Sequence, residues 1–274
     1  MKKKIGFIDL FIDEWHANHY PAMFRADPLF ENFELGYAFE KENQGGRNLK
    51  EWCREYGMLP ASSIEEVVEK SDVLCVLAPS NPEVHEELVA SALESGKPTY
   101  LDKPFAPTFA AAERIFAKAK EFHAPLMTSS ALRFGKEILE EKKHFSGSAS
   151  FVSVNGMGRS FEEYGIHIVE MAVSLLGCGA TGVKKLCQSP SGTAFQVMYG
   201  DERTAFLHYH PLMDYTITAA NGECAHTFGA STDIFKNLIS AMLKFYLTGI
   251  SPVPEKETLE VIRILEECVA LLKK

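Results

Sequence analysis

This chain has no long hydrophobic run, no excess of positive charge and no closely spaced cysteine pair. No stretch approaches the ~20 consecutive apolar residues that a bilayer-spanning helix needs. Lys and Arg number 28 against 37 Asp and Glu, a net charge of -9, so nucleic acid and anionic membranes are poor partners on electrostatic grounds. We therefore expect a soluble protein with neither kind of partner.

The cysteines indicate a reducing environment. They are Cys53, Cys75, Cys178, Cys187, Cys224 and Cys268. They form no C-x-x-C pair, so we expect reduced, mostly buried thiols and neither a disulfide framework nor a zinc site. The start, Met1–Lys4 followed by apolar residues, only faintly resembles a signal peptide, because Asp9, Asp13 and Glu14 interrupt the run. The expected location is the cytoplasm.

The first part of the chain alternates short apolar strands with helices. The expected strands are Lys4–Phe11, Phe33–Phe39, Asp72–Leu77, Pro98–Leu101 and Pro125–Thr128. The expected helices are Trp15–Phe24, Asn48–Tyr56, Ser63–Glu69, Pro82–Ser95 and Thr108–Glu121. A continuous apolar strand such as Asp72–Leu77 is typical of a parallel sheet covered on both faces. Residues 1–128 therefore predict a Rossmann-type doubly wound parallel sheet, an α/β domain.

The pattern changes near residue 130. The expected helices are Leu132–Phe145, Tyr164–Leu176, Ile234–Leu247 and Lys256–Leu272. The expected strands are Ala149–Asn155, Val183–Gln188, Thr193–Tyr199, Thr204–His210, Tyr215–Ala220 and Cys224–Phe228. Short turns such as Asn221-Gly222 join successive strands as hairpins. Residues 129–274 therefore predict an α+β domain with a mostly antiparallel, open-faced sheet, whose last helix packs back on the first domain.

The loop after the first strand lacks the glycines of a dinucleotide-binding turn. Such a turn reads G-x-G-x-x-G, because glycines let the backbone approach the pyrophosphate at a helix N-terminus. Asp9, Phe11 and Glu14 occupy the glycine positions, and Asp13 adds a carboxylate. One interpretation is a helix-capping cluster, since acidic side chains stabilise a helix N-terminus. The other is a reshaped loop in which Asp9 and Phe11 contact the cofactor.

Two further features near the carboxyl ends of the expected parallel strands are open to more than one interpretation. After the second strand, Glu40 or Glu42 could accept the ribose hydroxyls of NAD, and Arg47 could meet the 2′-phosphate of NADP. The same loop could equally be an ordinary solvated turn. His16 and His19, with Asp9 or Asp13, could bind a metal for lyase or isomerase chemistry, but they lack a tight ligand spacing, and we expect no metal site.

One helix of the second domain carries a possible acid–base group. Glu163, His167 and Glu170 are spaced i, i+4, i+7 and share one face of the expected helix. A His between carboxylates can be oriented as a proton acceptor. The alternative is a partly exposed helix face with a satisfied His. In the first domain, Lys103 directly follows a strand and precedes Pro104, so it is either a rigid positioning group or a surface Lys before a turn.

These motifs resemble those of a known oxidoreductase family. The segment APSNPEVHEELVASALESGKPTYLDKPFA is similar to the signature of the glucose–fructose oxidoreductase/inositol dehydrogenase (Gfo/Idh/MocA) family. The family's E-K-P motif reads Asp102-Lys103-Pro104 here. The resemblance implies NAD or NADP as cofactor, Lys103 between nicotinamide and substrate, and a cis Lys103–Pro104 bond. Its implied cofactor contacts in this segment are Ala78, Pro79, Asn81, His85 and Asp102.

The resemblance continues into the second domain. The helix with Glu163, His167 and Glu170 is similar to the family's D-x-G-x-H-x-x-D helix, although both carboxylates are one methylene longer. Carried over, His167 is the catalytic base, Glu163 assists it, and Glu170 and Arg133 line the substrate site. The resemblance also implies a sugar-like substrate and a homodimer or homotetramer formed through the second domain's sheet.

Two functions from different classes follow. The first is an NAD(P)-dependent oxidoreductase that moves hydride to or from a sugar, polyol or related hydroxyl-bearing metabolite, with Lys103, His167 and Glu163 as catalytic residues. The second is a non-catalytic family member that binds a sugar or regulates, because Asp9, Phe11, Asp13 and Glu14 weaken the expected grip on pyrophosphate.

Overall fold

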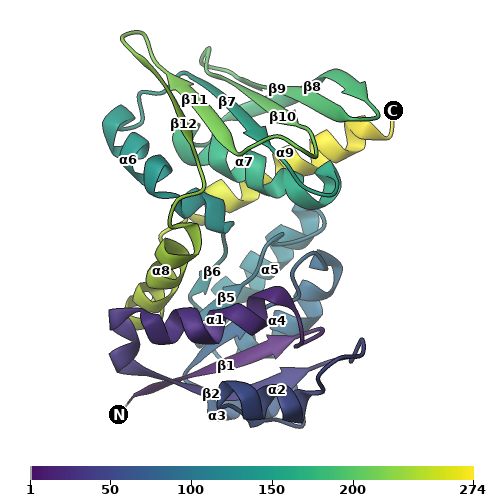
Figure 1. The fold of residues 1–274 in the computed structure, drawn as a ribbon, viewed down its shortest axis with the longest axis vertical. Coiled ribbons are helices and arrows are strands. Elements are labelled where there is room, and N and C mark those ends of the chain that lie inside the picture. The colour runs from purple at the N-terminus through teal and green to yellow at the C-terminus, as the bar shows by residue number, and fades with distance from the viewer. Residues whose placement is uncertain (1) are drawn as a thin grey trace. The chain divides into compact units, whose positions relative to one another are not determined.

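The computed structural model describes residues 2–274, which form two compact units. The first unit runs to Thr128 and includes Leu238–Val253, and the second comprises Ser129–Asn237 and Pro254–Lys274. The two sheets of Figure 1 are the centres of these units.

The first unit contains a six-stranded parallel sheet in the order β3-β2-β1-β4-β5-β6. Its strands are β1 (Lys3–Asp9), β2 (Phe33–Glu40), β3 (Leu59–Pro60), β4 (Val73–Val76), β5 (Thr99–Leu101) and β6 (Leu126–Met127). Its helices are α1 (Trp15–Ala26), η1 (Pro28–Asn32), α2 (Leu49–Tyr56), α3 (Ile64–Lys70), η2 (Pro82–Val84), α4 (His85–Glu94), α5 (Phe109–Glu121) and α8 (Ile234–Thr248, of which Leu238 onward lies in this unit). This strand order is that of a doubly wound nucleotide-binding sheet, with its switch point between β1 and β4.

Local sequence explains most of these elements. All four residues of β4 are buried, as expected for a strand covered on both faces. Helix α2 begins at a capping box between Asn48 and Glu51 and ends at Gly57, whose φ of 68° is left-handed. The sequence did not indicate η1 or β3, because each is too short to show a hydrophobic period.

Helix α8 belongs from Leu238 onward to the first unit, whereas the sequence grouped all of residues 129–274 in the second domain. Tyr246 on α8 donates its hydroxyl proton to the carbonyl of Leu74 at 2.9 Å, and its ring contacts Phe33 with centroids 6.2 Å apart. These contacts hold α8 against the parallel sheet of the first unit. The last helix, α9 (Glu255–Leu272), belongs to the second unit and packs against α7 and β8.

The second unit is built on a six-stranded mixed sheet in the order β12-β11-β7-β10-β9-β8. Its strands are β7 (Phe151–Gly156), β8 (Ala180–Ser189), β9 (Gly192–Tyr199), β10 (Thr204–Tyr209), β11 (Thr216–Ala220) and β12 (Ala225–Gly229). Only the β7–β10 pair is parallel among the pairings of this sheet in residues 2–274. Residues alternate between buried and partly exposed along β7 and β10, and α7 (Phe161–Leu176) packs against both strands (Figure 1). The predicted fold class, a Rossmann-type domain followed by an open-faced α+β domain, is confirmed.

Two helix boundaries differ from the sequence-based expectation. Helix α7 starts at Phe161 rather than Tyr164, because Ser160 caps it by accepting the Glu163 N–H at 3.2 Å. The helix expected over Leu132–Phe145 is divided at Gly135 into η3 (Ala131–Phe134) and α6 (Lys136–Phe145). At Gly135 the backbone is extended, with φ −52° and ψ 136°, and this separates the two helices.

Within residues 2–274, no helix is long and apolar enough to cross a membrane. The six cysteines form no disulfide in this part of the chain. Half of them are buried, namely Cys53, Cys75 and Cys268, so the expectation of mostly buried thiols was too broad. Cys187 is exposed, and Cys178 and Cys224 are half-buried.

Candidate functional site

Asp9 lies at the end of β1, at the switch point of the parallel sheet. Its side chain is fully buried, and Oδ1 accepts the Ala78 N–H at 3.0 Å and the Phe11 N–H at 3.3 Å. Oδ2 is buried without a hydrogen-bond partner in the part of the chain that the structure describes. Burial and the nearby Glu14 carboxylate raise the pKa of Asp9 well above its usual value. Asp9 therefore holds the loops after β1 and β4 together in place of a glycine.

Replacing Asp9 by Asn is expected to change how stability depends on pH. Because the pKa of Asp9 is raised in the folded protein, its ionisation opposes folding increasingly as pH rises from about 4, the usual Asp value, towards the folded pKa. Asn stays neutral and keeps the accepting oxygen. Thermal unfolding at several pH values should show Asp9→Asn gaining on the wild type as pH rises. Exposed Asp72→Asn is the control, and a difference for Asp9→Asn that is constant with pH would contradict the assignment.

Asp102, at the end of β5, is the centre of a second buried cluster. Its Oδ2 lies 2.5 Å from His16 Nδ1, and Oδ1 accepts the Tyr100 hydroxyl proton at 3.2 Å. Burial opposes ionisation, but His16 and the neighbouring Lys103 outweigh it and lower the pKa of Asp102 to about 2. The Lys103–Pro104 bond is cis, as the resemblance predicted. Asp102 thus anchors α1 to the strand end that carries Lys103, and a separation of 86 positions hid this link from sequence reasoning.

His85 joins the loops that follow β4 and β5. It is fully buried, with Nε2 3.1 Å from the Ala78 carbonyl oxygen and Nδ1 3.1 Å from the Phe105 carbonyl oxygen. Burial lowers the pKa of this imidazole. Ala78 and Ser80 have left-handed φ values of 70° and 66°, which non-glycine residues adopt at a cost and mostly where the surroundings impose it. His85 therefore helps to hold the loop after β4 in this conformation.

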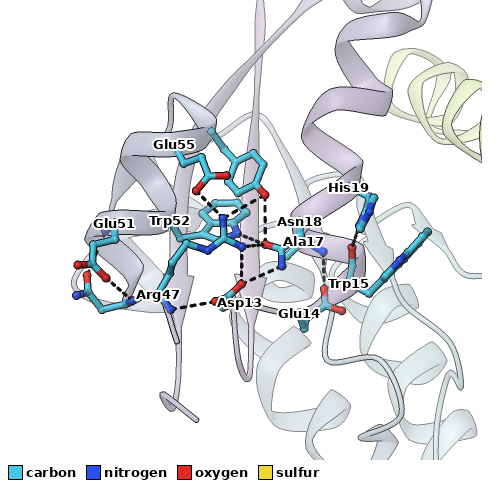
Figure 2. Close-up of polar contacts among 12 residues, drawn as sticks. Asp13, Glu14, Trp15, Ala17, Asn18, His19, Arg47, Glu51, Trp52 and Glu55 are labelled. Carbon is cyan, nitrogen blue, oxygen red and sulfur yellow. Dashed lines mark hydrogen bonds and ion pairs between the residues drawn. The ribbon is translucent and has the colours of Figure 1, made fainter. Parts of the chain in front are cut away.

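Glu14 occupies the N-terminus of α1. As the N-cap residue, its carboxylate accepts the His16 N–H at 2.8 Å. It also accepts the Ala17 N–H, as Figure 2 shows. Burial raises the pKa of Glu14. In a dinucleotide-binding fold these N–H groups face the pyrophosphate. The capping interpretation of the sequence agrees with this arrangement, in which an internal carboxylate takes the place of the phosphate oxygens.

Asp13 and Arg47 tie the loops after β1 and β2 together (Figure 2). Arg47 Nη2 lies 2.5 Å from Asp13 Oδ1, and the Arg47 N–H donates to Asp13 Oδ2 at 2.9 Å. Hydrogen bonds from Arg47 hold the pKa of Asp13 well below its usual range. Nη1 of Arg47 donates to Glu55 at 2.6 Å. Gly46, with φ 92°, is needed because a Cβ there would lie 2.8 Å from Asp13 Oδ2. Arg47 is thus already paired with two carboxylates.

The remaining predicted residues of this edge have local partners. Glu40 Oε1 accepts the Leu49 N–H at 2.9 Å, and the Asn81 amide donates to Glu83 at 3.3 Å. Pro79 is half-buried in the same loop as Asn81. His19 Nδ1 lies 2.6 Å from the Trp15 carbonyl oxygen. Because His16, His19 and Asp13 each contact a different partner, the structure gives no support to the metal-assisted alternative that would combine them.

In the second unit, His167 lies on α7 and contacts a residue that sequence reasoning missed. The Ser130 hydroxyl oxygen is 2.7 Å from His167 Nδ1 and also accepts the Leu132 N–H at 3.2 Å. If Nδ1 carries the proton, the lone pair of the ring is on Nε2. Glu163, one turn before His167, pairs with Arg159. His167 is half-buried.

Arg133 and Glu170 are buried together. Each is 4% exposed, and Arg133 Nη1 lies 3.6 Å from Glu170 Oε1. Nη2 of Arg133 also pairs with Glu257 at the start of α9, a partner 124 residues away that the sequence did not suggest. Glu170 Oε1 in turn accepts the Ser129 hydroxyl proton at 2.6 Å and the Ser130 N–H at 3.3 Å. The network fixes Ser130, and hence the partner of His167.

A dinucleotide fits part of this edge. The carboxyl ends of β1, β4 and β5 meet at the switch point, where open α/β sheets bind such ligands. The loop after β1 does not fit the usual pyrophosphate pose, because Glu14 holds the N–H groups of His16 and Ala17. Cofactor binding therefore requires Glu14 to move, or the pyrophosphate to be held differently.

Comparison with known proteins places these features in a family. Residues 17–130 match the model of the oxidoreductase family with an NAD-binding Rossmann fold. An uncharacterised oxidoreductase, YhhX of Escherichia coli, is 31% identical over 134 residues, which are 42% of this chain and 39% of that protein. The dehydrogenase aclE of Aspergillus oryzae is 26% identical over 51% of this chain and 39% of its own length. The match thus spans about two fifths of the length of these relatives.

Solved structures extend the likeness of fold to the whole chain. The myo-inositol 2-dehydrogenase of Lactobacillus plantarum has a TM-score of 0.80 at 13% identity, covering 100% of this chain and 98% of that one. The UDP-N-acetylglucosamine 3-dehydrogenase GnnA of Acidithiobacillus ferrooxidans has a TM-score of 0.80 at 13% identity, covering 99% and 96%. At such identity these structures establish the fold alone. Over residues 17–130 the chain thus matches the Gfo/Idh/MocA family of NAD-binding oxidoreductases, and its fold is shared end to end with these solved structures.

Proposed function

We propose that this chain is an NAD(P)-dependent oxidoreductase acting on a hydroxyl-bearing carbon of a sugar, polyol or related small metabolite. One contact carries the proposal: the Ser130 hydroxyl oxygen lies 2.7 Å from His167 Nδ1, and with the proton on Nδ1 the lone pair that can accept a substrate proton is on Nε2. The relatives named as dehydrogenases of myo-inositol and of a nucleotide sugar support this substrate class.

In the oxidation direction, four residues of the chain have different roles. His167 Nε2 accepts the hydroxyl proton while hydride leaves the carbon for the nicotinamide. Lys103, fixed beside buried Asp102, donates a hydrogen bond to the substrate oxygen. Arg133 and Glu170 act indirectly, because Glu170 accepts the Ser130 N–H and so positions the partner of His167. The homo-oligomer expected from the second unit's sheet stays a prediction.

The experiment is a binding and turnover screen on the purified chain. Calorimetry with NAD⁺, NADP⁺ and their reduced forms tests binding, and the absorbance of the reduced nicotinamide reports turnover with a panel of polyols, aldoses and nucleotide sugars. The proposal expects saturable binding of one cofactor and turnover with at least one member of the panel. Absence of binding by all four nicotinamide forms would overturn it.

A second function is favoured by one observation, the carboxylate of Glu14 on the N–H groups of His16 and Ala17. In that case the chain binds a sugar-like ligand without dinucleotide. The same calorimeter distinguishes the two functions, because a sugar then binds to a protein for which no nicotinamide form shows heat.

Replacing Glu14 by Gly is expected to strengthen cofactor binding. The change removes a buried carboxylate from the place of the pyrophosphate and releases two N–H groups, while Gly remains an acceptable N-cap. Removing about 1 kcal/mol of repulsion at a helix N-terminus corresponds to roughly fivefold tighter binding. Glu202→Gly, which removes an exposed Glu at a left-handed φ of 68° that glycine readily adopts, is the control. Unchanged affinity in Glu14→Gly would show that Glu14 does not compete with the phosphates.

A further inference from the structure

A cluster of nitrogen and sulfur ligands lies in the second unit, separate from every residue assigned above. His144 near the end of α6, Cys224 at the start of the last hairpin strand and His226 on β12 each present a ligand atom, and these atoms lie within 4.8 Å of one another. The Cys224 sulfur is 3.5 Å from His144 Nε2, and the two imidazole centroids are 4.5 Å apart. The three residues are half-buried or exposed, so an ion can reach them.

We propose that His144, Cys224 and His226 bind a zinc ion. Zinc–nitrogen and zinc–sulfur bonds of 2.0–2.3 Å put the ligand atoms of a tetrahedral site roughly 3.3–3.7 Å apart. The sulfur–nitrogen distance of 3.5 Å already has this value. Zinc accepts imidazole and thiolate together, whereas Mg²⁺ and Ca²⁺ require oxygen ligands. Three protein ligands leave the fourth position to water.

A carboxylate contacts one of the proposed zinc ligands. Glu141 Oε2 lies 2.8 Å from His226 Nδ1. A carboxylate on one imidazole nitrogen fixes the tautomer whose lone pair is on the other, and metal-binding histidines regularly have such a partner. Nε2 of His226 is therefore the nitrogen offered to zinc. In His144 the nitrogen that faces the Cys224 sulfur is Nε2, at 3.5 Å.

The turn before Cys224 holds its backbone in place. Asn221 Oδ1 accepts the N–H groups of Glu223 and Cys224, each at 2.9 Å, and the Asn221 N–H donates to the Cys224 carbonyl at 3.0 Å. Zinc would thus join a preformed hairpin to α6 across 80 residues of sequence. As the Zn–S bond forms, the thiol proton passes to solvent, so binding releases one proton.

Titration of the full-length protein with zinc tests the proposal. After treatment with a chelator, the wild type should bind one Zn²⁺ per chain by calorimetry and elemental analysis, and its unfolding temperature should rise with zinc. Co²⁺ should give a thiolate-to-metal absorbance band. Neither Mg²⁺ nor Ca²⁺ should bind.

Matched variants separate this site from unspecific thiol binding. Cys224→Ser should lose the Co²⁺ band and saturable zinc binding, and Cys187→Ser, which removes an exposed thiol from β8, should keep both. Glu141→Gln should weaken zinc binding about 10- to 100-fold. Where Cys224→Ser fails to fold by circular dichroism, His144→Gln replaces it. Equal zinc binding by the Cys224 and Cys187 variants, or none by the wild type, would overturn the site, and neither result bears on hydride transfer.

Discussion

Turnover by His167→Ala is expected to fall about 10²- to 10⁴-fold relative to the wild type, the usual contribution of a positioned acid–base group. The reason is that alanine has no group that can accept the substrate proton in place of the imidazole. The measurement is kcat for the substrate identified in the screen, together with the Kd of the cofactor. The Kd should stay unchanged, because His167 acts on the hydroxyl and not on the nucleotide.

Two variants make the result specific. Ser130→Ala keeps the imidazole but removes its contact at 2.7 Å, so kcat should fall less and its pH profile should shift, which a purely structural role would not produce. His123→Asn removes an exposed His from a left-handed position, φ 52°, that Asn adopts readily, and should leave kcat as it is. Turnover of His167→Ala within a few-fold of the wild type would remove His167 from the proton transfer.

Much of the fold could be predicted from the sequence because its signals are local. The apolar run at Asp72–Leu77 contains the buried strand β4 (Val73–Val76), and Gly96, at a left-handed φ of 70°, follows the helix α4 that it was expected to end. Asn221-Gly222 does join two antiparallel strands. Errors occurred where a signal is short or ambiguous: Ser160 was not recognised as a cap, and Gly135 was not recognised as a break.

The site could be predicted only in part, because its contacts connect distant residues. Sequence patterns identified Lys103 and His167 as residues in family-like contexts, but not the partners that hold them. Asp102 is bound by His16 across 86 residues, and Arg133 reaches Glu257 across 124. A hydrogen bond of this kind leaves no period or spacing in the sequence, so only the three-dimensional arrangement reveals it.

Loss of the Arg133 guanidinium is expected to have the largest effect on stability. Arg133→Met leaves the buried carboxylate of Glu170 and the half-buried carboxylate of Glu257 without their shared cation, and breaking a buried ion pair from one side costs about 3–5 kcal/mol. Burial lowers the pKa of Arg133, because removal from water opposes its charged form. Chemical denaturation should therefore show a much lower midpoint for Arg133→Met than for the wild type.

A variant at a neighbouring cation and a double variant test whether the loss of stability comes from the broken buried ion pair. Lys136→Met removes a charge from an exposed pair with Glu140, 4.0 Å apart, and should cost less than about 1 kcal/mol. Combining Arg133→Met with Glu170→Met removes both buried charges, so the double variant should be more stable than the sum of the single effects predicts. Additive effects would show that Arg133 and Glu170 contribute independently. The loss in Arg133→Met would then come from packing and from Glu257 alone.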